Sequence, residues 1–324
     1  MAGQRRCCYR EELIPANEAT IEWPRGLASD SKGNIYIADP RAGRVRKIDS
    51  FGIISTVLGD GSLDARVGVQ GTATGAQPYS VALDSKGNLY VAEPGLHMVR
   101  RVTPDGFVES VAGPQSGTFP LTLPDFPGSQ VVAVGPDDAI YYLAECNVNR
   151  WLAGKTEVFL PNICVNTRGV FEKPTVLAVG RDGAVYFGTG GYQRIRVLRN
   201  GQVQNLGDVF PFGNLAYPYA IHYGKDDLLY VTDYFLDLDL GQYYNLAYAL
   251  TATVRQVPIS YTYLLAEFKE IAPGLLEVVG ISKKAEPFAT VPLLGITTDS
   301  AGRVIVGHQW PPGLLIYPKV QVGN

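Results

Sequence analysis

Residues 78–113 read PYSVALDSKGNLYVAEPGLHMVRRVTPDGFVESVAG and define the unit from which the chain is built. Three turn signals, SKGN, EPG and TPDG, divide the stretch into four runs that are rich in Val, Leu, Tyr and Phe. Glycine and asparagine readily adopt the conformations of tight turns, and β-branched and aromatic side chains pack well on a pleated surface. The stretch therefore predicts four antiparallel strands. Such a sheet has two apolar faces to cover, so further copies are expected.

Copies of this unit recur along the chain. The turn and second strand reappear as SDSKGNIYIAD, VGPDDAIYYLAE, VGRDGAVYFGT, YGKDDLLYVTD and TDSAGRVIVGH. An arginine predicted on the third strand recurs at Arg46, Arg100, Arg150, Arg196 and Arg255. Six four-stranded units of about 45 residues predict one all-β domain, a six-bladed β-propeller of antiparallel blades. The blades are expected at about 21–61, 78–113, 127–164, 174–207, 218–280 and 292–324.

The sixth unit shows three strand-like runs, GITTDS, RVIVGH and GLLIYPKV, and lacks a fourth. The first unit is preceded by residues 1–20, which contain the run RRCCYREELIP. Because an incomplete last blade leaves an open sheet edge, we expect this segment to add a strand there and close the ring. The alternative is a frayed basic tail.

Composition and charge exclude several classes of protein. The formal net charge is −3 and no basic, aromatic platform is evident, so nucleic acid is not an expected partner. No run approaches the roughly 18 apolar residues of a membrane-spanning helix. The N-terminal residues MAGQRRCCYREELIP carry positive charge but no apolar signal-peptide core. We therefore expect a protein that is cytoplasmic, or part of a particle released without a signal.

The first two units resemble NHL repeats. The resemblance rests on the connecting stretch GDGSLDARVGVQGTATGAQPYSVALDSKGNLYVAE and on the third-strand patterns RVRKID and HMVRRVTPDG. It is strongest over residues 21–113 and continues over 174–233. It implies a six-bladed β-propeller. Such propellers include binding modules, lyases and lactonases, so the resemblance alone leaves the function open.

The fifth unit departs from this pattern. Asp233 and Arg255 are 22 residues apart, whereas the corresponding acid and arginine are seven apart in the first two units. Aligned on the arginine, the unit predicts two long loops, at about 234–252 and 259–273, so that deletion of 236–250 is expected to leave the fold intact. Long loops on a rigid scaffold often carry function.

The predicted loops are rich in aromatic residues, which suit contact with a protein partner because they offer large area with little rotamer entropy to lose. The alternative is that the rings fold back and cover their own blade. The candidate partner-binding residues are Tyr234, Phe235, Tyr243, Tyr244, Tyr248, Tyr261 and Tyr263.

The second-strand ends are expected to surround one mouth of the central channel. A ring of carboxylates and histidine there could bind a cation or a basic ligand. Because units with the acid also carry the third-strand arginine, the favoured interpretation is a salt bridge or turn cap inside each blade. The candidate mouth residues are Asp39, Glu93, Glu145, Asp233, His308 and His97.

Specific catalytic signatures are missing from the sequence. No HxH or HExxH spacing is present, so we assign no catalytic or metal-binding residue and no cofactor. One substitution within the repeat is a mild functional hint: His222 stands where other units carry a small residue. These equivalents are Ala28, Ala82, Ala133 and Ala178.

Four cysteines raise the question of a disulfide. Cys146 and Cys164 both belong to the third unit, on the side expected to face the channel mouth, and we hypothesise a bond between them. Buried free thiols are nevertheless the default expectation, because the sequence shows no signal peptide. A bond between the adjacent Cys7 and Cys8 would be strained on a strand, where the two side chains point to opposite faces.

The sequence therefore favours a non-enzymatic binding or assembly module. In this hypothesis the rigid propeller docks to a protein partner in a larger complex or particle, such as a virion or surface structure, through the aromatic loops of blade five. The alternative is a propeller lyase or lactonase that uses a divalent cation at the channel mouth.

Overall fold

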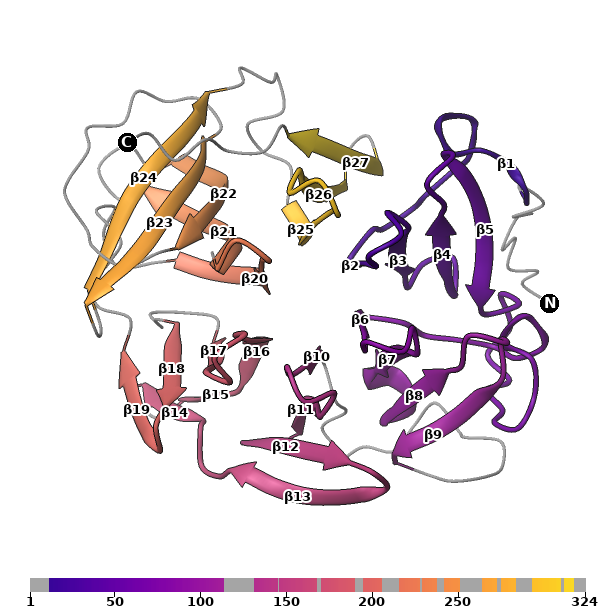
Figure 1. Cartoon of the computed structure of the whole chain (residues 1–324), viewed down its shortest axis with the longest axis horizontal. Helices are drawn as coiled ribbons and strands as arrows, with labels where there is room; N and C mark the ends of the chain where they lie inside the picture. The colour runs from indigo at the N-terminus through magenta and orange to yellow at the C-terminus, as the bar shows by residue number, and fades with distance from the viewer. Residues whose placement is uncertain are drawn as a thin grey trace.

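The computed structural model describes residues 12–113, 131–144, 146–167, 170–189, 195–205, 216–227, 229–237, 242–250, 264–272, 275–283, 293–309 and 312–317. Within these ranges the regular elements are β-strands and three short 3₁₀ turns: η1 (Ala16–Glu18), η2 (Gly71–Ala73) and η3 (Pro94–Leu96). The sheets surround a common centre (Figure 1). No helix in the described part of the chain is long and apolar enough to cross a membrane.

Three sheets have the predicted order of four consecutive antiparallel strands. The second sheet contains β6 (Ser80–Leu83), β7 (Leu89–Glu93), β8 (Met98–Val102) and β9 (Val108–Ala112). The third contains β10 (Val132–Val134), β11 (Ile140–Ala144), β12 (Asn147–Leu152) and β13 (Lys155–Leu160). The fourth contains β16 (Pro174–Val179), β17 (Val185–Thr189), β18 (Arg196–Arg199) and β19 (Gln202–Asn205). A hairpin of β14 (Val165–Thr167) and β15 (Val170–Glu172) separates the last two along the chain.

The first sheet has a fifth strand at its outer edge. It contains β2 (Gly26–Ser29), β3 (Ile35–Asp39), β4 (Arg44–Ile48) and β5 (Ile53–Leu58), and β1 (Ile14–Pro15) pairs with β5. For residues 12–20 this pairing corrects the expectation that residues 1–20 complete the last blade, because β1 covers the outer edge of the first sheet instead. Glu12 stabilises the arrangement by accepting hydrogen bonds from Thr56 and by pairing with Arg46 at 3.6 Å. Residues 1–11 lie outside the described ranges.

The fifth sheet differs most from the prediction. Its strands are β20 (Ala216–Tyr223), β21 (Leu229–Asp237), β22 (Gln242–Leu250), β23 (Leu264–Ala272) and β24 (Leu275–Lys283). The predicted loop at 234–252 is wrong for residues 234–237 and 242–250, which are strand, and β22 occupies the third position assigned to the strand of Arg255. The predicted loop at 259–273 is likewise strand over 264–272. β22 and β23 run parallel, unlike the predicted antiparallel order.

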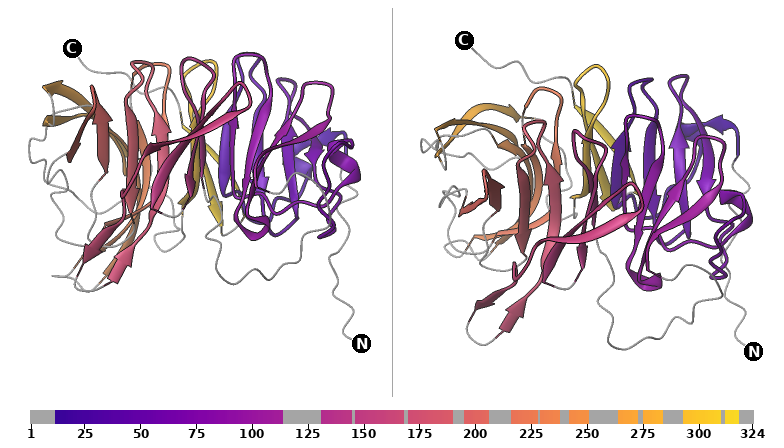
Figure 2. Two further views of the ribbon diagram at one scale, coloured as in Figure 1. Left: turned by 90° about the horizontal axis from the view of Figure 1, so that it is seen from below. Right: turned by 60° about the horizontal axis from the view of Figure 1, so that its bottom comes forward.

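The last sheet contains three strands in the described part of the chain: β25 (Leu293–Thr298), β26 (Val304–Gln309) and β27 (Pro312–Tyr317). Its innermost strand lies beside the first sheet. Neighbouring innermost strands contact one another in the order β2, β6, β10, β16, β20 and β25, and β25 contacts β2. Figure 2 shows these strands running along the short axis of the molecule.

The repeated turn has a chemical basis. Asp84 Oδ1 accepts the backbone N–H groups of Lys86 and Asn88 at 3.0 and 2.8 Å, and Tyr90 donates its hydroxyl hydrogen to Asp84 Oδ2. Gly87 has a φ of 83°, which other residues adopt at a cost. In the first unit, Asp30 makes the equivalent contacts with Lys32, Asn34 and Tyr36.

The core lies between neighbouring sheets. Apolar side chains on the facing surfaces of two sheets fill the gap between them, as they do between the first and second, the second and third, and the third and fourth sheets. The first and second sheets share a cluster that includes Leu58 and Val91. Ile305 of β26 is fully buried in a cluster with Ile37 and Ile54 of the first sheet, so the last and first sheets also pack together.

Candidate functional site

Glu93 at the end of β7 forms an ion pair with Arg100 on β8. Both side chains are fully buried, and Arg100 donates Nη2 to Glu93 Oε1 at 2.8 Å and Nε to Oε2. The guanidinium also donates to the carbonyl oxygens of Gly75 and Arg66. Glu93 Oε1 accepts a further bond from the backbone N–H of Gln77. The salt bridge predicted within this unit is present, and both carboxylate oxygens are engaged by protein donors.

Asp39 at the end of β3 caps a turn. Its fully buried carboxylate accepts the backbone N–H groups of Glu22, Trp23 and Ala42 at 2.7, 3.1 and 3.2 Å. Burial raises the pKa of Asp39, whereas these backbone hydrogen bonds act in the opposite direction. Asp39 therefore fixes the chain that leads into β2, as Glu93 fixes the chain that leads into β6.

The other predicted mouth residues are placed as follows. His97 ends the turn η3 in the left-handed conformation, with a φ of 54°. Asp233 belongs to β21 and His308 to β26, but their side chains are not described, and Glu145 lies outside the described residues. A shared ring of these carboxylates therefore remains a prediction.

The predicted partner-binding residues fall into two groups. Tyr234 and Phe235 belong to β21, whereas Tyr243, Tyr244 and Tyr248 belong to β22. The register pairs Phe235 with Tyr244. Tyr261 and Tyr263 lie outside the described residues.

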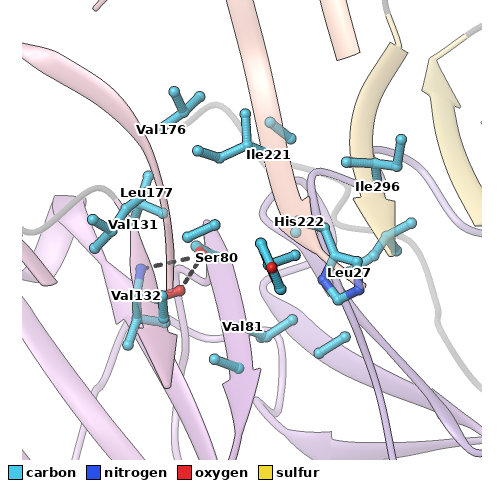
Figure 3. Close-up of a pocket in the computed structure, with 18 of the residues that line it drawn as sticks. Leu27, Ser80, Val81, Val131, Val132, Val176, Leu177, Ile221, His222 and Ile296 are labelled. Atoms are coloured by element: carbon cyan, nitrogen blue, oxygen red, sulfur yellow. Dashed lines mark hydrogen bonds between the residues drawn. The ribbon is translucent and has the colours of Figure 1, made fainter. Parts of the chain in front are cut away.

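A cavity of about 190 Å³ occupies the centre of the ring. Residues on the innermost strands of all six radial sheets line it. Figure 3 shows side chains from different sheets converging on this space. The labelled apolar residues are Leu27, Val81, Val131, Val132, Val176, Leu177, Ile221 and Ile296.

Arg25 brings a positive charge to the lining of this cavity. Its guanidinium carbon lies 3.8 Å from the ring centroid of Tyr79 and 5.5 Å from that of Trp23, and Nη2 donates to the Tyr79 hydroxyl. Burial lowers the pKa of Arg25 to about 10, while Tyr219 acts in the opposite direction. Arg25 therefore stays protonated at neutral pH. The sequence prediction missed it, although it follows Pro24 just as Tyr79 follows Pro78.

His222 supplies a second polar group to the lining. Its Nε2 lies 3.0 Å from Thr298 Oγ1 of β25, so the hydrogen bond links the fifth and last sheets. The side chain is half-buried, with protein around it and the cavity on one side. Burial lowers its pKa to about 4, and Lys225 acts in the same direction. The ring is therefore neutral at pH 7.

This pKa predicts a dependence of stability on pH. The ordinary pKa of histidine is about 6.5, so between pH 4 and 6.5 the unfolded state binds more protons and stability rises with pH. The contribution of His222 to the free energy of unfolding is expected to fall by about 2 kcal/mol when the pH is lowered from 7 to 4.5. His222→Gln can keep a hydrogen bond to Thr298 but does not titrate, so its stability should fall by about 2 kcal/mol less over this range. Equilibrium urea unfolding of both proteins at the two pH values measures the difference; the same pH dependence in both proteins would contradict the prediction.

The hypothesised disulfide is present. Cys146 and Cys164 are bonded, with their Cα atoms 4.9 Å apart. The bond joins the start of β12 to the segment after β13, where Ile163 also donates its N–H to the Cys146 carbonyl at 2.7 Å. The default expectation of free thiols is therefore wrong for this pair.

The first part of the chain matches a known protein family. Residues 3–74 match the family model described as the teneurin NHL domain. The predicted resemblance to NHL-repeat proteins is confirmed. Within the described residues, no group of three or more His, Cys, Asp or Glu side chains is arranged to hold a metal ion.

Solved structures share a similar fold with this chain over nearly its full length. A catalytically inactive virginiamycin B lyase from Staphylococcus aureus with quinupristin is 16% identical, with a TM-score of 0.54 over 89% of this chain and 92% of that chain. A gluconolactonase from Xanthomonas campestris is 15% identical, with a TM-score of 0.56 over 92% and 87%. At these identities the likeness shows a propeller-like fold alone.

Proposed function

We propose that the chain is a closed six-bladed propeller that acts as a non-enzymatic binding or assembly module, docking to a protein partner through its fifth sheet. The ring of contacts among the innermost strands, from β2 around to β25, supports closure. The contact of Ile305 with the first sheet supports it as well. A rigid disc of this kind suits a scaffold in a larger complex, a virion or a surface structure.

The long, aromatic-bearing strands of the fifth sheet are the observation that supports the proposal most strongly. β21, β22, β23 and β24 each span nine residues, whereas strands of the second, third and fourth sheets span three to six. Two of these long strands bear the five aromatic residues predicted to contact a partner. Aromatic residues are enriched at interfaces and in their energetic hot spots.

The structure changes the experiment that tests this function. Deletion of 236–250 would remove β22 and disrupt the sheet, so substitution is the better test. Phe235→Ser with Tyr244→Ser alters one cross-strand pair and is expected to weaken partner association at least tenfold, because hot-spot aromatics contribute about 2 kcal/mol or more each. Tagged protein is isolated from its native source, its partner is identified by mass spectrometry, and the affinity is measured with both purified.

The matched control is Phe51→Ser, which removes an aromatic ring that is 88% exposed in the turn between β4 and β5. This variant should bind the partner like the wild-type protein. Thermal unfolding of each variant reports whether the fold persists. Wild-type affinity in a folded Phe235→Ser/Tyr244→Ser protein would refute docking through the fifth sheet, as would purification without any stoichiometric partner.

The fold likeness to a lyase and a gluconolactonase favours a second candidate, a metal-dependent lyase or lactonase acting at the channel mouth. The central cavity would be its substrate site. Metal analysis of the purified protein separates the two functions. A stoichiometric divalent cation, with a thermal shift on adding Ca²⁺, Mn²⁺ or Zn²⁺, would favour the enzyme; neither is expected of the binding module.

A further inference from the structure

Arg25 is a partly buried cation in the lining of the central cavity. Its Nε is buried and has no hydrogen-bond acceptor, and no carboxylate pairs with the guanidinium among the described residues. The only side-chain acceptor that it reaches in this part of the chain is the Tyr79 hydroxyl. A desolvated charge costs free energy unless it is paired and hydrogen-bonded, and the faces of Tyr79 and Trp23 compensate only in part.

The surrounding chain holds Arg25 and its aromatic neighbours in place. Asp39 accepts the backbone N–H of Trp23, two residues before Arg25. Glu93 accepts the N–H of Gln77, two residues before Tyr79. Because both carboxylates are fully buried, these segments are fixed before any ligand arrives. A fixed arrangement loses less entropy on binding than a mobile one.

Next to this cation lies a cavity that both apolar and polar residues line. The cavity that Arg25 lines is about 190 Å³, smaller than the roughly 300–1,000 Å³ of pockets for drug-sized ligands. Figure 3 shows Leu27, Val81, Ile221 and Ile296 around it. His222, in the same lining, is neutral at pH 7 and adds no second charge there. The site therefore combines one positive charge with a small cavity that apolar side chains line in part.

We propose that the central channel binds a small organic carboxylate, which pairs with the Arg25 guanidinium while its apolar body occupies the cavity. Guanidinium donors match the geometry of a carboxylate and form charge-assisted hydrogen bonds with it. The cavity is lined by β20 of the fifth sheet and not by the aromatic residues of β21 and β22, so the proposal does not depend on docking to a protein partner.

Calorimetric titration tests the proposal with benzoate, its neutral isostere benzamide and inorganic phosphate. The wild-type protein is expected to bind one benzoate per chain. Benzamide lacks the charge and phosphate lacks the apolar body, so each should bind at least tenfold more weakly. Arg25→Met should weaken benzoate binding at least tenfold, since it keeps the length of the side chain and removes the charge.

Arg41→Met is the matched control, because the Arg41 guanidinium also lies over Trp23, at 5.2 Å, but does not line the cavity. It should bind benzoate within twofold of the wild-type protein. Wild-type binding of benzoate by Arg25→Met would overturn the proposal. Equal binding of benzoate and benzamide to the wild-type protein, or no saturable benzoate binding, would also overturn it, and these two results do not depend on whether a variant folds.

Discussion

Replacing Arg100 with Met is expected to lower the free energy of unfolding by about 3–5 kcal/mol. The substitution leaves the fully buried Glu93 carboxylate without its cation and removes the donors from the Gly75 and Arg66 carbonyl oxygens. Removing one partner of a buried ion pair is far more costly than the pair's net contribution, because the remaining charge stays desolvated. Equilibrium denaturation in urea measures the loss.

Arg101→Met is the matched control on the same strand. Arg101 pairs with Glu109, which is 47% exposed, and exposed pairs contribute about 0–1 kcal/mol because water screens them. Arg101 also lies over Trp151, at 5.9 Å, so a small loss of packing is included in this comparison. Equal losses for the two variants would contradict a structural role for the buried pair.

Replacing Cys146 and Cys164 with Ser is expected to cost about 3 kcal/mol of stability. The bond joins residues separated by 18 positions, and the cross-link reduces the entropy of the unfolded chain by closing a loop of this length. The stability of the wild-type protein should fall by a similar amount when a reductant is added. Urea unfolding with and without reductant measures both effects.

The double serine variant is its own control, because its stability should not respond to reductant. Intact-mass measurement after alkylation adds a direct check: without reductant, Cys146 and Cys164 should stay unmodified. Alkylation of both thiols in the non-reduced protein, or a wild-type stability that ignores reductant, would contradict the bond.

Local chemistry explains why much of the fold could be predicted. Asp84, Gly87 and Tyr90 act within one turn, so their spacing in the sequence reports the contacts that they make. Arg100 on β8 faces Val91 on β7, two residues before Glu93, so its side chain can reach the Glu93 carboxylate. The recurrence of an acid and an arginine at this spacing therefore indicated the pair. The relation is not identical in every unit. Arg46 pairs with Glu12 and Arg150 pairs with Asp137, contacts that no repeat spacing indicates.

Features that depend on contacts between distant segments could not be predicted from the sequence. The role of Arg25 depends on its contact with Tyr79 and on a cavity that six strands line, and neither relation repeats periodically along the chain. The loops predicted in the fifth unit are wrong because the alignment on Arg255 assumed four strands as short as those of the other units. The run QYYNLAYAL is a nine-residue strand that pairs with β21 over its whole length.

We expect the buried Glu93–Arg100 pair to act as part of the frame that holds the chain leading into β6, and not as a site for a ligand. A double-mutant cycle on Glu93→Gln and Arg100→Met measures the coupling between the two side chains. The expected coupling free energy in urea unfolding is about 2–3 kcal/mol, because each single variant leaves its buried partner unpaired. A coupling below about 0.5 kcal/mol would show that the two residues act independently and would rule out this structural role.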